Sequence, residues 1–172
     1  MKQLVIIFVM GLILSTIVRA DEPTLCEKQE VSVVSCGIKG KQQKIVSICA
    51  VIDSKTPDKN FIEYRFGTKK NIQLSYKVTR QTTDQKLYRW VDKVTYTTYF
   101  GFNKGEFSYS VGVPEERFGA LTFVSVKKNG NDISNLECKT NSFGEKKLNS
   151  SLIVDVSDDF LRSNKNLVFP PK

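Results

Sequence analysis

The feature that most constrains the fold is a hydrophobic period of two that recurs along the chain. Apolar and polar side chains alternate over residues 62–66 and again over residues 72–76, with a Gly-Thr-Lys-Lys-Asn segment between the two runs. Alternation of this kind gives each strand of an antiparallel pair one apolar and one polar face. The two runs are therefore expected to form adjacent strands.

Other segments have the same strand-like character. Residues 31–36 and 44–51 are rich in β-branched side chains and flank a glycine-containing turn, which predicts a hairpin. Asn129-Gly130 lies between two further strand-like runs and is a strong hairpin signal. With the aromatic-rich residues 88–99, we count about eight to ten short strands, a spacing typical of compact antiparallel folds. The sequence predicts an all-β fold, either an antiparallel β-sandwich or a barrel-like sheet.

The N-terminus has the pattern of a secretory signal peptide. Lys2 precedes an apolar run from Leu4 to Leu14, and the small residues Val18 and Ala20 precede Asp21. We predict that residues 1–20 are removed on export to the periplasm or beyond the cell. Residues 21–172 are then one β-rich domain, extended at its C-terminus by a strand over 152–156 and a helical turn that Ser157 caps. An uncleaved anchor is the alternative, although residues 4–18 are fewer than the roughly 20 that span a bilayer.

Four cysteines remain after cleavage, and they are Cys26, Cys36, Cys49 and Cys138. An even number in an exported domain predicts two disulfides, for which three connectivities are possible. Zinc is the competing use, but the chain has no histidine and no closely spaced cysteine pair. A bridge to Cys138 would close a loop of about 90–110 residues and stabilise the fold by roughly 4–5 kcal/mol on the chain-entropy model.

The net charge bears on the choice of partner. The formal charge of +8 falls to +6 when Lys2 and Arg19 leave with the signal peptide. A basic surface suits a neutral or acidic protein, or an anionic envelope lipid or polysaccharide, and it also fits an ordinary solvated surface. Export makes nucleic acid a poor candidate partner.

The residue types present exclude most catalytic chemistry. Without histidine there is no His-based triad, dyad or metal site, and bridged cysteines supply no thiolate. The sequence contains no cofactor motif. A pair of carboxylates is the remaining route to catalysis, and the candidates are Glu63, Glu106, Glu115, Glu116, Asp155, Asp158 and Asp159. No pair stands out, so we predict a protein without catalytic residues, metal or cofactor.

Candidate binding residues fall in two turns and one strand. Six aromatic residues crowd residues 88–102, either as a stacking platform or interface, or simply as strand interiors. An exposed hairpin tip carrying two phenylalanines would need a partner. The candidates are Phe100, Phe102, Lys104 and Glu106 in one turn, Lys127, Lys128 and Asn129 in another, and Glu63 and Arg65 as a polar patch on a sheet face. Alternatively, Arg65 is only solvated, opposite a core-facing Tyr64 and Phe66.

Short motifs in residues 25–140 resemble a family of uncharacterised secreted bacterial β-rich proteins. They comprise Leu25-Cys26, Ser35-Cys36, Ser47-Ile48-Cys49-Ala50, Tyr64-Arg65-Phe66-Gly67 and the later hairpin at Lys128-Asn129-Gly130. The resemblance implies a β-rich exported domain and assigns no activity or functional residue.

These observations predict a non-catalytic exported binding protein, such as a periplasmic inhibitor or an immunity protein against a wall-targeting enzyme. One alternative is an envelope surface protein that binds anionic lipid or polysaccharide. A small carbohydrate-active enzyme is the other.

Overall fold

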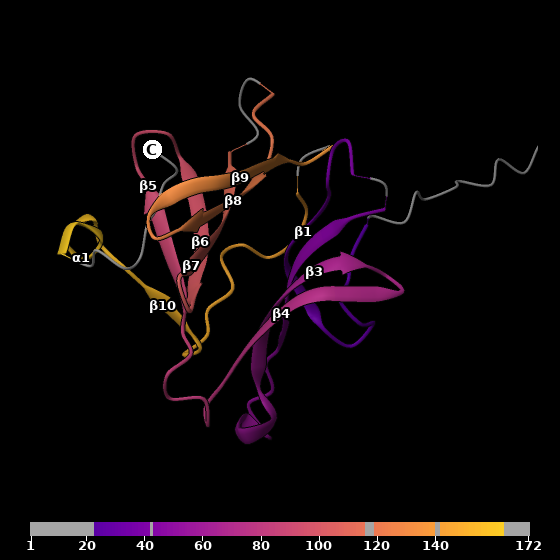
Figure 1. The fold of residues 1–172 in the computed structure, drawn as a ribbon. Coiled ribbons are helices and arrows are strands. Elements are labelled where there is room, and N and C mark those ends of the chain that lie inside the picture. Colours follow the sequence, from indigo (N-terminus) through magenta and orange to yellow (C-terminus); the bar gives the residue numbers. More distant parts are fainter. Residues whose placement is uncertain (1–22, 42, 116–118, 140–141, 164–172) are drawn as a thin grey trace, which may run out of the picture.

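A computed structural model describes residues 23–41, 43–115, 119–139 and 142–163, so the predicted signal peptide lies outside the described residues. Two sheets face each other as a β-sandwich, and the described residues form no closed barrel (Figure 1). The all-β prediction with two disulfides is therefore confirmed. No helix in the described part of the chain is long and apolar enough to cross a bilayer.

The first sheet has four antiparallel strands in sequence order. They are β1 (Val31–Gly37), β2 (Ile45–Val51), β3 (Phe61–Thr68) and β4 (Asn71–Thr79), and a short 3-10 turn, η1 (Pro57–Lys59), precedes β3. The alternating runs at residues 62–66 and 72–76 pair as predicted, with Tyr64 opposite Tyr76. A bulge follows Phe66, and Gly67 occupies it because a Cβ there would come within 2.3 Å of the Asn71 carbonyl oxygen.

The second sheet has six strands in the order β10-β5-β6-β7-β8-β9. Their bounds are β5 (Leu87–Asp92), β6 (Thr97–Lys104), β7 (Phe107–Pro114), β8 (Phe123–Lys128), β9 (Asn131–Glu137) and β10 (Ile153–Asp155), and α1 (Asp158–Ser163) follows β10. The Asn129-Gly130 hairpin is confirmed. One strand departs from the antiparallel prediction, because β10 pairs with β5 in parallel. It reaches β5 through a long connection, which parallel pairing requires.

The core lies between the sheets and draws on both. Phe102 of β6 stacks on Tyr76 with ring centroids 4.0 Å apart and meets the edge of Tyr64 at 5.0 Å. Val46 and Ile48 of β2 and Val111 of β7 belong to the same buried cluster. Burying side chains of this size stabilises the fold by about 1.5–3 kcal/mol each, so this shared core is the main force that holds the sheets together.

The structure selects one of the three disulfide connectivities. Cys36 of β1 bridges to Cys138, which follows β9, and this bond ties the two sheets together. Cys26 bridges to Cys49 of β2, which ties the N-terminal segment (residues 23–30) to the outer face of the first sheet. Disulfides persist in oxidising compartments, so both bonds indicate a non-cytoplasmic environment.

Candidate functional site

The polar face of the four-stranded sheet is covered by the N-terminal segment. Ser35 and Ser47 point from β1 and β2 to this side and hydrogen-bond to each other at 2.6 Å. The Ser35 hydroxyl also donates to the Pro23 carbonyl, and the Leu25 amide donates to the Ser47 hydroxyl. Ser35 and Ser47 therefore anchor the N-terminal segment to the sheet.

Arg65 is the centre of an ion-pair network beneath the same segment. Its guanidinium makes two hydrogen bonds of 2.7 Å to the Glu30 carboxylate, one of 2.7 Å to Glu63 and one of 2.9 Å to the Leu25 carbonyl. The side chain of Glu30 is only 3% exposed. Arg65 and Glu63 were predicted as an open polar patch or as solvated residues. The open patch and the solvated Arg65 are both wrong, because Glu30 and the N-terminal segment cover these residues. The core-facing positions predicted for Tyr64 and Phe66 are confirmed.

The network shifts the pKa values of Glu63 and Arg65. Burial alone would raise the pKa of Glu63, but hydrogen bonds from Arg65 and Ser75 and the charges of Arg65 and Lys77 hold it below the ordinary value. Burial opposes the charge of Arg65 as well, yet Glu30 and Glu63 raise its pKa. Glu63 and Arg65 are therefore both charged at neutral pH, and the hydrogen bonds of Arg65 to Glu30 and to the Leu25 carbonyl clamp the N-terminal segment.

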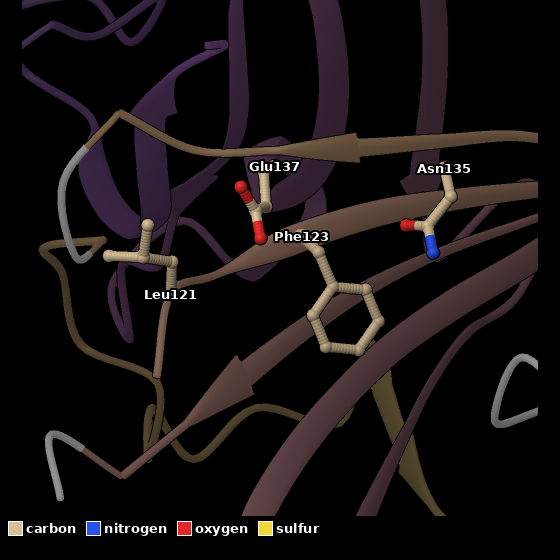
Figure 2. Close-up of a pocket in the computed structure, with 4 residues that line it drawn as sticks. All are labelled: Leu121, Phe123, Asn135 and Glu137. Carbon is tan, nitrogen blue, oxygen red and sulfur yellow. The ribbon is translucent and has the colours of Figure 1, made fainter. Parts of the chain in front are cut away.

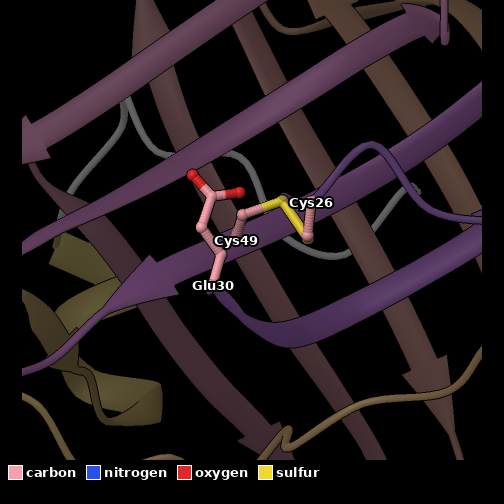
Figure 3. Close-up of side chains that lie close together, drawn as sticks. All are labelled: Cys26, Glu30 and Cys49. Atoms are coloured by element: carbon pink, nitrogen blue, oxygen red, sulfur yellow. A yellow bond between two sulfur atoms is a disulfide. The ribbon is translucent and has the colours of Figure 1, made fainter. Parts of the chain in front are cut away.

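Cys26, Cys49 and Glu30 lie close enough together to resemble a metal site (Figure 3). The two sulfur atoms are joined to each other, however, and the Glu30 carboxylate accepts both hydrogen bonds from Arg65. Metal ligation by cysteine needs thiolates. This cluster is therefore a structural cross-link.

The two phenylalanines predicted at an exposed tip belong to the core. Phe100 and Phe102 are both 1% exposed, because they lie within β6 on the face that meets the first sheet. The prediction of an exposed aromatic tip is wrong. Lys127, also predicted as a tip residue, is almost fully buried and lies 3.5 Å from the Asp132 carboxylate.

The other predicted turn residues come together at one end of the strands of the second sheet. β7 pairs with β8, so the β6–β7 and β8–β9 turns adjoin, and the Asn129 amide donates to the Glu106 carbonyl. Lys128 lies 3.5 Å from Glu106 and above the Phe107 ring. Lys104 approaches the Ser75 carbonyl of β4 at 3.5 Å. These exposed residues, two lysines, one glutamate and one asparagine, lie together at one end of the second sheet, although the sequence places them in two separate turns.

The outer face of the six-stranded sheet carries the aromatic residues that point away from the core. Trp90 stacks on Tyr99 at 5.1 Å, and Tyr99 meets the edge of Phe123 at 6.0 Å. Phe160 and Leu161 of α1 pack on this row, and the Trp90 indole N–H donates to Asp158 at 2.7 Å. Trp90 is therefore not an open stacking platform, because helix α1 packs against the same aromatic row.

A shallow pocket continues this face beyond the helix. Leu121, Phe123, Asn135 and Glu137 line it (Figure 2). Glu137 is already paired with Lys39 at 3.1 Å. The pocket offers one aromatic edge and one amide, which is little for selective binding.

Among the described residues, the two most exposed large apolar side chains lie in a turn that the sequence does not signal. Residues 93–96 connect β5 to β6, although residues 88–99 read as one continuous strand-like stretch. Val94 is 87% exposed and Tyr96 is 56% exposed, and Val91 is exposed beside them. We call these three residues the apolar turn.

Hydrogen bonds fix the backbone of the apolar turn. The Asp92 carboxylate accepts from the Val94 amide at 2.8 Å and from the Thr95 hydroxyl at 2.7 Å. Burial opposes the ionisation of Asp92, but the hydrogen bonds from Thr95 and Val94 together hold its pKa below the ordinary value. Tyr96 adopts the left-handed conformation at a φ of 53°, and its carbonyl accepts from the Glu115 amide. Holding a bulky residue there costs on the order of 1 kcal/mol.

A pocket of about 390 Å³ opens beside the apolar turn. Its lining includes Val91 and Tyr96 from the turn region, Glu115, and the ion pair between Arg89 and Asp155. Arg89 donates two hydrogen bonds to Asp155, at 2.6 and 2.8 Å, which lower the pKa of that carboxyl. Lys146 and Lys147 line it as well, so the pocket combines apolar and charged groups, a lining suited to a side chain of a partner.

The acidic residues considered for catalysis are mostly engaged in structural pairs. Glu63 and Asp155 face arginines, Glu106 faces Lys128, and Asp159 faces Arg162. A general acid needs a raised pKa, whereas those of Glu63 and Asp155 are lowered. Glu115 and Asp155 share a pocket, and Glu116 lies outside the described residues.

No family model, no curated protein and no solved structure matches the chain.

Proposed function

We propose that this chain is an exported, non-catalytic binding protein that recognises another protein through the apolar turn. The single observation that carries the proposal is the 87% exposure of Val94 on a backbone fixed by Asp92. Exposing apolar side chains to water is unfavourable, and a partner that covers them recovers that free energy. A fixed turn also loses little entropy on binding.

The class of partner follows from shape and charge. A protruding turn with a neighbouring pocket is suited to a cleft, so an enzyme of the cell envelope, such as a wall-degrading hydrolase, is the favoured target. The basic charge of the mature chain favours a neutral or acidic partner over a cationic one. The two disulfides support the same compartment.

Two observations support the proposal that the protein is not a catalyst. The sequence contains no histidine, and all four cysteines are bridged. Glu63 and Asp155 are held ionised by arginines and are poorly suited to donate a proton.

The test is a comparison of three baits in an envelope extract from the native cell. Val94→Ser with Tyr96→Ser removes the apolar turn, while Ile52→Ser with Ile133→Ser removes two other exposed apolar side chains. We expect a protein that the wild type and the control retain and the turn variant loses at least tenfold. Equal capture by all three baits, or no captured protein, would contradict the proposal.

A further inference from the structure

Two turns of the four-stranded sheet place five lysines at one end of the molecule. Gly37 pairs with Ile45, and Ile45 pairs with Gly67, so the β1–β2 turn and the β3–β4 turn lie side by side. Figure 1 shows both projecting from the sheet. We call this group the lysine end, and it consists of Lys39, Lys41, Lys44, Lys69 and Lys70.

The negative charge near the lysine end comes from Glu27, which lines a surface hollow with Lys69, and from Glu137. Residues 38–44 and 68–71 contain no aspartate or glutamate. Lys39 pairs with Glu137, and Lys44 donates to the neutral amide of Gln73. The opposite end of the same sheet differs, because residues 52–60 balance two lysines with Asp53 and Asp58. The positive charge is therefore concentrated at one end.

An apolar side chain projects among these lysines. Ile72, which follows the β3–β4 turn, is 42% exposed. It lines the same surface hollow, of about 530 Å³, whose charged lining residues are Glu27, Lys28, Arg65 and Lys69. Lysines around an exposed isoleucine suit the boundary of a bilayer, where ammonium groups meet phosphates and the apolar group enters the acyl region.

The described chain also begins at this end. The Pro23 carbonyl accepts from Ser35, and the Pro23 ring lies against Gly37, the last residue of β1. Pro23 is the third residue after the predicted cleavage site, so the described part of the mature chain enters the fold at the lysine end.

We infer that the lysine end is a membrane-binding surface that holds the protein against a bilayer rich in anionic lipid. This second surface is separate from the apolar turn, which belongs to the other sheet. The charges sit on turn tips around an apolar residue and do not follow a groove, so they fit a flat lipid surface better than a polymer chain. Bound in this way, the protein has its β5–β6 turn available to a partner.

The test is co-sedimentation of the oxidised, envelope-purified protein with vesicles. Vesicles containing 40% phosphatidylglycerol in phosphatidylcholine are compared with pure phosphatidylcholine at 50 and 250 mM NaCl. Each lysine close to an anionic surface strengthens binding about fivefold. Lys69→Gln with Lys70→Gln should therefore weaken binding roughly 25-fold. Lys55→Gln with Lys59→Gln, the same charge change at the opposite end of the sheet, should leave it unchanged.

The outcomes separate lipid from other anions. Binding to the mixed vesicles that falls steeply with salt, and that Ile72→Ser weakens several-fold, would support the inference. Equal binding to both kinds of vesicle, or equal losses in the two lysine variants, would overturn it. Binding to soluble dextran sulfate but not to vesicles would also overturn it, in favour of a polysaccharide. None of these results depends on capture of a partner by the apolar turn.

Discussion

The two sheets cover their outer faces in different ways. The four-stranded sheet presents serines, a cysteine and an arginine, and the N-terminal segment closes over them with a disulfide and the Arg65 network. The six-stranded sheet presents aromatic rings, and the short helix α1 packs on them. The first face is therefore held by charge and covalent bonds, while the second is held by apolar packing. Substitution and pH should affect the two faces differently.

The largest contrast is expected between two buried arginines. Arg65→Gln leaves Glu30 buried without its partner and should lower the free energy of unfolding by about 3–5 kcal/mol. Arg89→Gln removes the partner of Asp155, but the Asp155 side chain is already 67% exposed and water can solvate it. We therefore expect the free energy of unfolding to fall by only about 1 kcal/mol. Urea unfolding of both variants measures the difference. Equal losses would show that Glu30 is not the buried charge that holds the first face.

The second prediction concerns backbone space beneath the aromatic face. A Cβ on Gly112 would lie 2.3 Å from the Phe123 ring, so Gly112→Ala should cost about 1–3 kcal/mol through overpacking. Gly37→Ala is the matched control in the first sheet, because its nearest neighbour would be at 3.5 Å. Thermal unfolding of the pair distinguishes them, and a destabilised Gly37→Ala with an unchanged Gly112→Ala would reverse the account.

The third prediction isolates the polar contact of α1. Trp90→Phe keeps an aromatic ring against Tyr99 but removes the hydrogen bond to Asp158, which should cost about 1 kcal/mol. Asp159→Asn, one residue further along the same helix, removes only the exposed pair with Arg162 and serves as the control. Helix α1 should also show faster amide hydrogen exchange in Trp90→Phe. Unchanged exchange would mean that apolar packing alone holds the helix.

The smallest expected effect is a pH dependence of the first face. The folded-state pKa of Glu63 lies below its ordinary value of 4.5, so its ionised form is favoured by folding. Its contribution is present above about pH 4.5 and is lost as the pH falls through the lower folded value. Glu63→Gln should therefore flatten the fall in unfolding free energy between pH 5 and 2.5 more than Asp155→Asn does. The more exposed Asp155 makes the weaker contribution, and a larger effect of Asp155→Asn would contradict this order.

Strand periodicity and turn chemistry made most of the fold predictable. The alternating pairs and the Asn129-Gly130 turn carry local signals, and the structure bears them out. The helix cap was also readable, since the Ser157 hydroxyl accepts from the Phe160 amide and α1 begins at the next residue, Asp158. The disulfide connectivity depends on contacts between distant segments, which period and composition do not encode.

The turn at residues 93–96 shows where sequence reasoning failed. Val94, Thr95 and Tyr96 are all good strand formers, and no glycine or proline marks the turn. The available signal was Asp92, whose side chain commonly accepts from the backbone two residues on. Because that signal was missed, Phe100 was placed beside a turn, when it lies in the middle of β6. Likewise, Glu30 is 35 residues from Arg65, and no local pattern pairs them.

Site-specific photocrosslinking in living cells tests the central claim most directly. A photoreactive residue in place of Val94 should give a discrete adduct with a second envelope protein, while the same residue in place of Ile133, which is also exposed, should give none. An adduct at position 133 alone, or no adduct at either position, would contradict recognition through the apolar turn.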